Sequence, residues 1–572
     1  MGKEDINKIK KITDDNSEDL DEENEVVEDI EEVVENPDGT KKKRRKKLPL
    51  IINLFKNIKK KNNNIVISGF CLVKIMGVKE HETDELKLQI GDDIYNIKFK
   101  IKNGIKFIKN YRFNFYKVEL PLDKIVNMDI QNKLLVLYKE LRPGRILYNA
   151  LDITKGKNRV SKIITHNNRA IFLRQTVKNT MYLTVREVTP YDNFKGKLKL
   201  LTGWFLSKLM VFKKDFILLF EKEASRYEES ASVVYEKLID MGYENVYYII
   251  DKENIKLKEI DEKYKKNIIY KNTLKHITYF FKCKKFVGTE ALGHAMQLRV
   301  ANKLVLDKLK SKDIMYVFLQ HGVMYMVSLS SELRTGFKKM DIKLHKIVTS
   351  SEEEANHFIE LGGFERDDLY VCGLPKFDTA IRHDNADKIV IMPTWRRWEA
   401  NEASLNYENT KYYKMIKRIV ETIPKKLQDK VIILPHPLML KEIKNNKEYK
   451  KYIPKGEFTY DDILKECRLL ITDYSSIAYD AYFRGSNVIF YWEEKEECME
   501  QYGSEAKLML NEDNVFADVC YNTEDLSKVI EKNYNNKQDP KNKKKFKKIV
   551  QFDDRKNTER LIEMLIEDGV LE

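Results

Sequence analysis

The stretch Phe318-Leu-Gln-His-Gly-Val-Met-Tyr-Met326, "FLQHGVMYM", places a histidine and a glycine where an apolar run ends. The run before it, Ile314–Phe318, predicts a buried strand. Another apolar run, Lys430–Leu434, ends in the same way at Pro435-His436-Pro437. Open parallel sheets bind their ligands at the carboxyl ends of strands. His321 and His436, alone among the nine histidines in directly following such a run, are therefore candidate functional residues.

Around these strand ends, apolar strands alternate with helical stretches from about Leu201 onward. The predicted strands include "DFILLFE", "NVYYIID", "KKFVGTE", "KIVTS", "KIVIMPTW", "KVIILPHP", "LLITDYSS" and "NVIFYW". This alternation predicts an α/β fold with parallel sheets, and two sets of it predict two Rossmann-like domains, residues 201–385 and 386–572, facing a cleft. A cleft between domains is the expected ligand site. Neither a GxGxxG after the first strand nor a GxxxxGK[ST] is present, which disfavours dinucleotide oxidoreductases and P-loop enzymes.

The segment before these domains has a different character. Residues 61–200 contain short alternating or β-branched runs such as "NIVISGF", "ELKLQIG" and "MYLTVREV", which predict an antiparallel β-rich accessory module. Residues 1–60 are expected to be a disordered tail, first acidic ("DDNSEDLDEENEVVEDIEEVVE", from Asp14) and then basic.

The basic part of this tail, "KKKRRKK" at Lys41–Lys47, is followed by the apolar "LPLIINLF" and by "KNIKKK". Two interpretations remain open. The segment is either a solvated linker or a contact with an anionic membrane, to which each basic residue near the surface contributes about 1 kcal/mol. The second interpretation predicts a peripheral location on the inner face of the cell membrane.

Composition restricts the classes of partner. A formal charge of +14 over 572 residues indicates a polyanionic partner. The six cysteines form no CxxC pair, so we expect reduced thiols in the cytoplasm and no zinc site. No run reaches the roughly 20 apolar residues of a membrane span. The aromatic residues form no RNA-binding pattern, and a nucleic-acid partner is not expected.

The strand ends of the second set carry further candidates. Thr394 and Arg396 in "MPTWR" supply a hydroxyl and a guanidinium suited to phosphate. Ser475 and Ser476 in "TDYSS" are expected at a helix N-terminus, where backbone N–H groups and hydroxyls bind phosphate oxygens. Asp480, one helical turn later, is a candidate for ribose hydroxyls. Taken singly, an ordinary N-cap serine and a solvated aspartate remain open alternatives.

Taken together and in order, "QHG" (320–322), "GLPKFD" (373–378), "MPTWR" (392–396), "HP" (436–437) and "TDYSSIAYD" (472–480) resemble the CDP-glycerol glycerophosphotransferases, the teichoic-acid polymerases and primases. The resemblance covers about residues 201–500 and implies a GT-B fold with a CDP-alditol donor between the two domains. It implies His321 as catalytic base and His436 as a second essential histidine. The donor-binding residues that it implies are Gly322, Val323, Met324, Tyr325, Lys376, Pro393, Thr394, Ser475, Ser476 and Asp480, with Arg396 close by.

The expected reaction transfers glycerol phosphate, or another alditol phosphate, to a hydroxyl of a membrane-linked teichoic-acid-like or capsular polymer and releases CMP. A neutral imidazole suits proton removal near pH 7. We expect no metal and no cofactor, because fixed cations and N–H groups can offset the diphosphate charge. Two alternatives stay open: a GT-B glycosyltransferase that uses a nucleotide-sugar, and a non-catalytic protein that binds polyanions or membranes.

Overall fold

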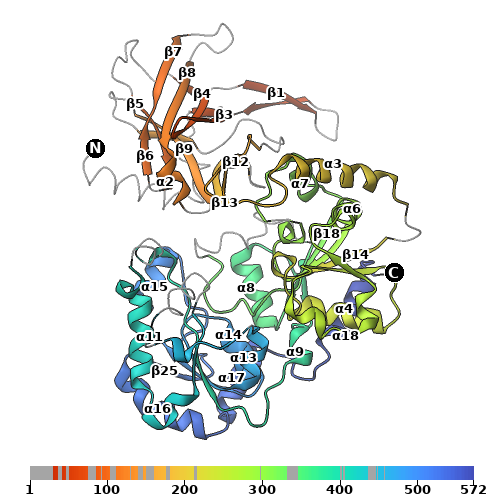
Figure 1. The fold of residues 1–572 in the computed structure, drawn as a ribbon, viewed down its shortest axis with the longest axis vertical. Coiled ribbons are helices and arrows are strands. Elements are labelled where there is room, and N and C mark those ends of the chain that lie inside the picture. Colours follow the sequence, from red (N-terminus) through yellow and green to blue (C-terminus); the bar gives the residue numbers. More distant parts are fainter. Residues whose placement is uncertain are drawn as a thin grey trace. The chain divides into compact units, whose positions relative to one another are not determined.

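The protein is seen in a computed structural model and divides into two compact units (Figure 1). The first unit comprises Met1–Trp204 and Arg299–Ser311, and the second comprises Phe205–Leu298 and Lys312–Glu572. The structure describes residues 30–35, 41–46, 51–74, 85–91, 93–103, 111–128, 131–139, 146–149, 160–175, 181–211, 215–296, 298–330, 345–399, 402, 406–435, 446, 449–456 and 458–571.

The first unit contains the expected antiparallel β-rich module. One sheet has the strand order β3-β4-β8-β7, and another has the order β11-β12-β13-β9-β5-β6 with β10 paired to β9. Both sheets are antiparallel throughout. The elements are β3 (Ile51–Lys61), β4 (Asn64–Lys74), β5 (Glu85–Ile90), β6 (Asp93–Asn96), β7 (Lys98–Asn103), β8 (Tyr111–Pro121), α2 (Leu122–Val126), β9 (Gln131–Lys139), β10 (Ile146–Asn149), β11 (Ile164–His166), β12 (Arg169–Gln175), β13 (Met181–Glu187) and α7 (Lys303–Leu309).

This module starts earlier than the sequence predicted. β1 (Ile30–Glu35) pairs antiparallel with β2 (Lys41–Lys46), and β3 begins at Ile51, ahead of the expected boundary at residue 61. β3 pairs with β4 over its whole length, and Phe55 and Ile58 are buried in the core of the module. Phe55 and Ile58 are therefore held by the fold, whereas Leu48 and Leu50 of the predicted membrane contact lie outside the described residues.

The second unit begins with a seven-stranded parallel sheet in the order β16-β15-β14-β17-β18-β19-β20, which with its helices is called the first lobe below. Within this sheet β14 comes first in the sequence, β15 and β16 lie on one side of it, and β17 to β20 lie on the other. The topological switch point is therefore between β14 and β17. The elements are β14 (Ile217–Phe220), α4 (Ser230–Asp240), β15 (Val246–Ile250), α5 (Glu262–Lys265), β16 (Ile268–Tyr270), α6 (Leu274–Lys282), β17 (Lys285–Gly288), β18 (Met315–Phe318), β19 (Lys346–Thr349), α8 (Glu352–Gly362), β20 (Leu369–Val371) and α9 (Lys376–Thr379).

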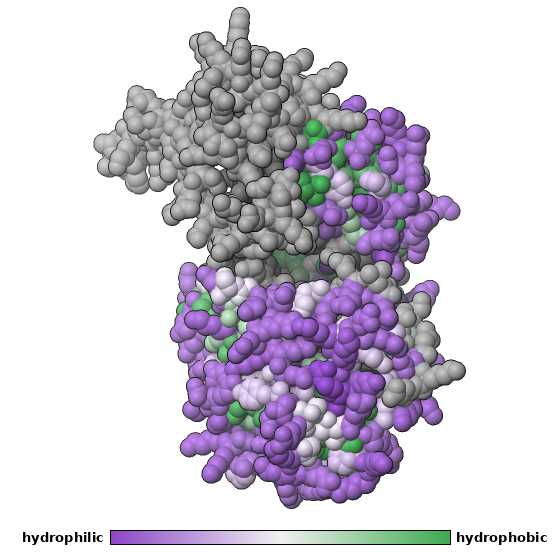
Figure 2. Space-filling view, turned by 90° about the vertical axis from the view of Figure 1, so that its left-hand side faces the viewer, coloured by the Kyte–Doolittle hydropathy of each residue, from purple (hydrophilic) through white to green (hydrophobic). Residues whose placement is uncertain are grey.

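A five-stranded parallel sheet in the order β22-β21-β23-β24-β25 forms the second lobe, and its topology switches between β21 and β23. Figure 2 shows that the outer face of this lobe, in the lower part of the view, is largely hydrophilic. The elements are β21 (Lys388–Ile391), α11 (Lys411–Thr422), β22 (Val431–Ile433), α13 (Tyr460–Glu466), β23 (Cys467–Thr472), α14 (Ile477–Phe483), β24 (Asn487–Tyr491), α15 (Lys495–Tyr502), β25 (Asp518–Cys520), α16 (Thr523–Asn535), α17 (Pro540–Ile549) and α18 (Asn557–Glu567).

The end of the chain returns to the first lobe, contrary to the expectation that residues 386–572 form one domain. α18 packs on α4 and α9. Lys237 on α4 pairs with Glu559 at 2.8 Å, and Asp568 pairs with Lys346 at 2.7 Å. The alternation of strands and helices in the sequence cannot predict this return, because α18 would show the same amphipathic pattern on either sheet.

Two further findings concern the described residues of both units. Cys283, Cys372, Cys467, Cys498 and Cys520 are buried and form no disulfide among the described residues. Within the described ranges, the helices lack the combination of length and apolar character that a membrane span needs.

Candidate active site

A cavity of about 270 Å³ lies between the first and second lobes and contains five of the predicted site residues. His321 and Lys376 line it from the first lobe, and Ser475, Ser476 and Asp480 line it from the second. Its walls follow the carboxyl ends of β14, β17 and β18 on one side and of β23 on the other. Both topological switch points therefore open into this cavity, which is where parallel sheets bind ligands.

His321 is held at the cavity by a strained turn. β18 ends at Phe318, and Gln320 then adopts a left-handed φ of 60°, which is uncommon for any residue except glycine. The Gln320 amide is buried and donates a 2.6 Å hydrogen bond to the Val348 carbonyl on β19. The anchored Gln320 reverses the chain and leaves the His321 side chain exposed at the cavity wall.

Gly322 and Lys376 bring this turn into contact with the second lobe. A Cβ at Gly322 would lie 2.8 Å from the Ser476 hydroxyl oxygen, so any larger residue would require the serine side chain to move. The Lys376 Nζ lies 2.5 Å from the Asp480 Oδ1 and donates to the His321 carbonyl at 2.9 Å. One cation thus links the histidine turn with α14.

The rest of the predicted stretch points away from the cavity. Val323, Met324 and Tyr325 are buried in the protein core. The Met324 N–H donates to Glu354 at 2.6 Å, and the Tyr325 hydroxyl donates to Glu353 at 2.8 Å. These three residues support the His321 turn and do not line the cavity.

Arg396, predicted to lie near the donor phosphate, is instead part of a buried ion network. Its guanidinium is 2% exposed, lies 2.7 Å from Asp473 and 3.0 Å from Glu494, and donates to the Thr394 carbonyl. Burial lowers the pKa of Arg396, but the charges of its acidic neighbours, first of them Asp473, and the hydrogen bond to Asp473 together outweigh this effect, and the pKa lies well above its ordinary value. The guanidinium hydrogen bonds are directed to carboxylates and a carbonyl of the protein.

Pro393 and Thr394 also lie outside the set that lines the cavity. Pro393 is buried and accepts a hydrogen bond from Tyr412, and the Thr394 N–H donates to Asp473 at 2.7 Å. The Thr394 hydroxyl is buried and makes no hydrogen bond within the described part of the chain. The remaining candidate, His436, lies outside the described residues.

Three glutamates that the sequence analysis did not single out form the first-lobe wall of the cavity. Glu228 and Glu229 follow β14, and Glu290 follows β17. Burial, and then the neighbouring Glu229 charge, raise the pKa of Glu290 to about 7. Burial also raises the pKa of Glu228 and of Glu229, and the Lys376 charge partly offsets the effect at Glu229.

These carboxylates are only partly satisfied by the protein. Arg226 lies 3.3 Å from Glu228 and 3.7 Å from Glu229. The Oε2 atoms of Glu228 and Glu229 are both buried without a hydrogen bond among the described residues. A carboxylate oxygen accepts hydrogen bonds only, so this wall suits a ligand that donates hydroxyl protons. Glu290 could have been identified from the sequence, because the predicted strand "KKFVGTE" ends on it. His321 was identified by the same rule, since it also follows a predicted strand.

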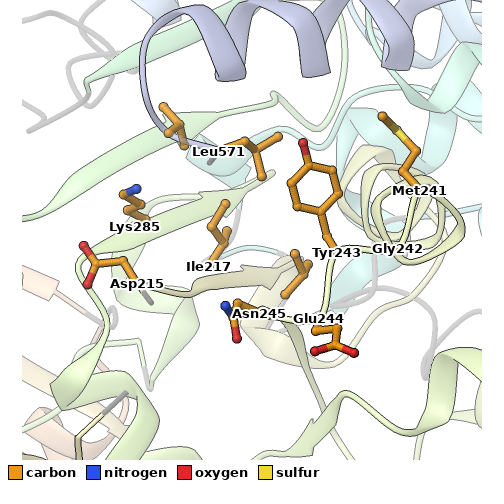
Figure 3. Close-up of a pocket in the computed structure, with 11 residues that line it drawn as sticks. Asp215, Ile217, Met241, Gly242, Tyr243, Glu244, Asn245, Lys285 and Leu571 are labelled. Atoms are coloured by element: carbon orange, nitrogen blue, oxygen red, sulfur yellow. The ribbon is translucent and has the colours of Figure 1, made fainter. Parts of the chain in front are cut away.

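A larger cavity of about 370 Å³ lies elsewhere on the first lobe and has a different chemistry (Figure 3). It lies at the amino ends of β14, β15 and β17, beside Asp215, Asn245 and Lys285. The Lys285 Nζ donates to the Gly569 carbonyl at 3.1 Å. None of the predicted site residues lines this second cavity. The cavity between the lobes is therefore the candidate active site.

In the part of the chain that the structure describes, no group of three or more His, Cys, Asp or Glu side chains is arranged to hold a metal ion. The cations that face the cavity are the side chains Lys222, Arg226, Lys376 and Arg484. Three of them are already paired within the protein, Arg226 with Glu228, Lys376 with Asp480 and Arg484 with Asp461, so a ligand phosphate would share these cations with carboxylates.

Comparison with known proteins gives matches in both sequence and structure. The chain is 23% identical over 535 residues to the minor teichoic acid biosynthesis protein GgaB of Bacillus subtilis (strain 168), covering 90% of this chain and 55% of GgaB. This chain thus spans about half the length of that relative. A solved structure of the wall teichoic acid polymerase TagF matches at 14% identity and a TM-score of 0.46, covering 66% of this chain and 97% of that one. A UDP-N-acetylglucosamine 2-epimerase structure from Listeria monocytogenes matches at 10% identity and a TM-score of 0.40, covering 63% and 98%.

The family comparison covers most of the chain and includes both lobes. The model for CDP-glycerol:poly(glycerophosphate) glycerophosphotransferase matches residues 204–567. The match includes every residue that lines the cavity. The chain belongs to the CDP-glycerol:poly(glycerophosphate) glycerophosphotransferase family.

Proposed function

We propose that this protein transfers glycerol phosphate, or another alditol phosphate, from a CDP-alditol to a hydroxyl of a teichoic-acid-like or capsular polymer and releases CMP. The observation that carries the proposal is the convergence of His321, Lys376, Ser475 and Ser476 on one cavity in a chain of this family. The matched GgaB is named for minor teichoic acid biosynthesis, which agrees with such an acceptor. Two parallel-sheet lobes with the ligand between them also suit a GT-B architecture.

In the proposed reaction His321 is the general base. Its imidazole takes the proton of the acceptor hydroxyl, the oxygen attacks the phosphorus next to the alditol, and the bond to CMP breaks. Such a positioned base contributes roughly 10²–10⁴-fold. Lys376 and the two serines are assigned to the donor phosphates, where preorganised donors offset developing charge. His436 is retained as a second catalytic histidine from the family resemblance alone.

The charges of the cavity suggest how the substrates are oriented. Phosphates would be repelled by Glu228, Glu229 and Glu290, so the diphosphate is assigned to the Ser475–Ser476 side. The hydroxyl-bearing part of the substrates is assigned to the glutamate wall, whose unsatisfied oxygens accept hydroxyl protons. Asp480 is paired with Lys376, so we assign it to holding that cation and no longer to ribose alone.

The cellular setting belongs to the same proposal. We place the enzyme in the cytoplasm, peripheral on the inner membrane face, with a polyanionic lipid-linked polymer as acceptor. The formal charge of +14 favours such an acceptor electrostatically. No nucleic-acid partner and no cofactor are included.

A donor comparison tests the reaction. Purified protein is incubated with CDP-glycerol, CDP-ribitol, a UDP-sugar or a GDP-sugar, each with a membrane extract as acceptor, and the released nucleotide is identified. We expect CMP from one CDP-alditol and no UDP or GDP. Release of UDP or GDP would instead support the glycosyltransferase alternative. Failure of all four donors, together with retention of RNA on filters at physiological salt, would support a polyanion-binding protein.

A further inference from the structure

One face of the strands β12 and β13 in the first unit carries an arginine beside a threonine. Thr184 on β13 lies opposite Phe172 on β12, so Arg174, two residues further along β12, is its diagonal neighbour. Such neighbours project from the same face of a sheet, and a long side chain can span the distance between them. Phe172 packs against Ala301. This face is therefore covered by the segment Arg299–Ser311, which belongs to the same unit.

The covering segment brings further cations to Arg174. Arg186 on β13 donates from its Nε to the Arg299 carbonyl at 3.1 Å, and Arg299 adopts a left-handed φ of 55°, which is uncommon for any residue except glycine. The positive charges of Arg299 and Arg186 act on Arg174. The charge of Arg174 acts in turn on Lys310. Arg174 thus lies among three other cations.

One of these cations is neutralised within the unit, and Arg174 is not. Arg186 binds Asp192 through two hydrogen bonds of 2.5 and 2.7 Å, and both residues are buried. The Arg174 Nε is buried and makes no hydrogen bond among the described residues. Burial, and then the charges of Arg299 and Arg186, lower the pKa of Arg174 from 12.5 to about 10, so it stays charged at neutral pH. Positive charge is therefore in excess around Arg174.

The Thr184 hydroxyl is a second buried polar group on this face. The residue is 0% exposed, and its Oγ1 makes no hydrogen bond within the part of the chain that the structure describes. Buried polar groups in proteins are almost always hydrogen-bonded, because burying a donor or a charge without a partner is unfavourable. The Arg174 Nε and the Thr184 hydroxyl are therefore both available to an acceptor from outside the chain.

We infer that this face of the first unit is a binding site for a phosphate group, called the arginine patch below. Its members are Arg174, Thr184, Arg299 and Lys310. A guanidinium donates in a planar fork that matches phosphate oxygens, and a hydroxyl can donate to a further oxygen. A phosphate suits the patch better than a carboxylate, because it offers more acceptor oxygens to several donors. The three cations of the patch are each partly exposed, so a ligand can reach them from solvent.

The arginine patch is not part of the candidate active site. None of its members lines the cavity between the lobes. β12 and β13 also precede residues 204–567, which match the family. The bound phosphate can be a phosphodiester of a polyanionic polymer or inorganic phosphate. The first source rests on the proposed function, whereas the phosphate chemistry of the patch does not depend on it.

Calorimetric titration of the full chain with inorganic phosphate, at constant ionic strength, tests the inference. We expect saturable binding to the wild type and at least tenfold weaker binding to Arg174→Met. Because this substitution removes a buried charge that the protein does not neutralise, its thermal unfolding midpoint in phosphate-free buffer should equal or exceed that of the wild type. An arginine with a purely structural role would instead lower the midpoint when replaced.

Two controls isolate the patch. Arg169→Met changes another arginine of β12 that is not a member of the patch, and it should bind phosphate as the wild type does. Lys376→Met weakens any phosphate binding in the cavity between the lobes and should leave the heat from the patch unchanged. Neither measurement requires turnover, so a failure of the proposed reaction would not alter the result.

A second variant keeps the test decisive if Arg174→Met folds poorly. Thr184→Val keeps the shape of the side chain and removes a hydroxyl that makes no hydrogen bond among the described residues. We expect wild-type unfolding in phosphate-free buffer and at least threefold weaker phosphate binding. Unchanged phosphate affinity in either variant, once folded, would overturn the inference, as would the absence of saturable binding to the wild type.

A second ligand identifies the source of the phosphate. Oligo(glycerol phosphate) is titrated into the wild type and into Arg174→Met. Binding at least tenfold tighter than that of inorganic phosphate, and lost in Arg174→Met, would assign the patch to the polymer. Equal affinity of the two ligands for the wild type, with the same loss in Arg174→Met, would assign it to free phosphate. Equal binding of the oligomer by both proteins would show that the patch does not hold the polymer.

Discussion

Two cations that the sequence assigned to the donor phosphate, Lys376 and Arg396, occupy very different surroundings. Lys376 lies at the cavity wall beside Asp480, with the His321 carbonyl as a further partner. Arg396 is enclosed in the second lobe, where Asp473 and Glu494 neutralise it. A cation next to a strand end can therefore reach the cleft, as Lys376 does, or be enclosed by carboxylates of its own lobe, as Arg396 is.

Breaking the buried network around Arg396 should lower the free energy of unfolding more than any other change proposed here. Arg396→Met would leave the carboxylates of Asp473 and Glu494 without their cation, which costs roughly 3–5 kcal/mol when such a pair is buried. Denaturant unfolding followed by circular dichroism measures it. As a control, Lys411→Met removes an exposed pair with Glu497 and should cost about 0–1 kcal/mol. If Arg396→Met and Lys411→Met had equal free energies of unfolding, the buried ion network around Arg396 would not stabilise the fold.

The next effect is on turnover, at the cavity. His321→Ala should lower kcat by roughly a hundredfold or more, because it removes the proposed proton acceptor. Its unfolding midpoint should match the wild type, since the ring is exposed. His383→Ala, an exposed histidine paired with Glu466, is the control and should retain activity. Near-normal CMP release by folded His321→Ala would remove this residue from the mechanism.

A smaller effect is expected on donor binding. Lys376→Met should raise the donor KM at least tenfold, because hydrogen bonds to charged groups contribute roughly 1.5–3 kcal/mol. Lys376 also bridges the two lobes, so Lys256→Met, which removes the bridge from Lys256 to Asp462, controls for that role. An equal rise in KM for both variants would mean that Lys376 acts by joining the lobes and not by contacting the donor.

The last effect is a pH dependence of the free energy of unfolding, and it arises from Glu290 on the first-lobe wall of the cavity. Burial raises the pKa of Glu290 from its ordinary 4.5 to about 7. A raised acid pKa favours the folded state fully below pH 4.5, and this contribution is lost as pH rises through about 7. Glu290→Gln should therefore be more stable than wild type by roughly 1–3 kcal/mol at pH 8.5 and equal to it near pH 4.5. A pH-independent difference between the two proteins would contradict the raised pKa.

Most strands of the two lobes could be predicted from the sequence, because an apolar run such as Lys430–Leu434 has the same pattern in any surroundings. The place of His321 just after a strand could be predicted for the same reason. The buried pairing of Arg396 could not be predicted, because Asp473 and Glu494 lie 77 and 98 residues away and only tertiary folding brings these carboxylates to the guanidinium. Glu228 and Glu229 were overlooked for a related reason, because consecutive glutamates before a helix look like a solvated first turn until the cavity is seen.

We propose that the cavity between the lobes binds a CDP-alditol, and calorimetric titration of the purified protein measures this binding. The His321→Ala protein is used because its proposed defect in turnover leaves the donor intact. We predict that CDP-glycerol or CDP-ribitol binds this protein at one site and that adding Lys376→Met weakens binding at least tenfold, whereas UDP-sugars do not bind. No heat from either CDP-alditol, or equal affinity with and without Lys376, would contradict the claim.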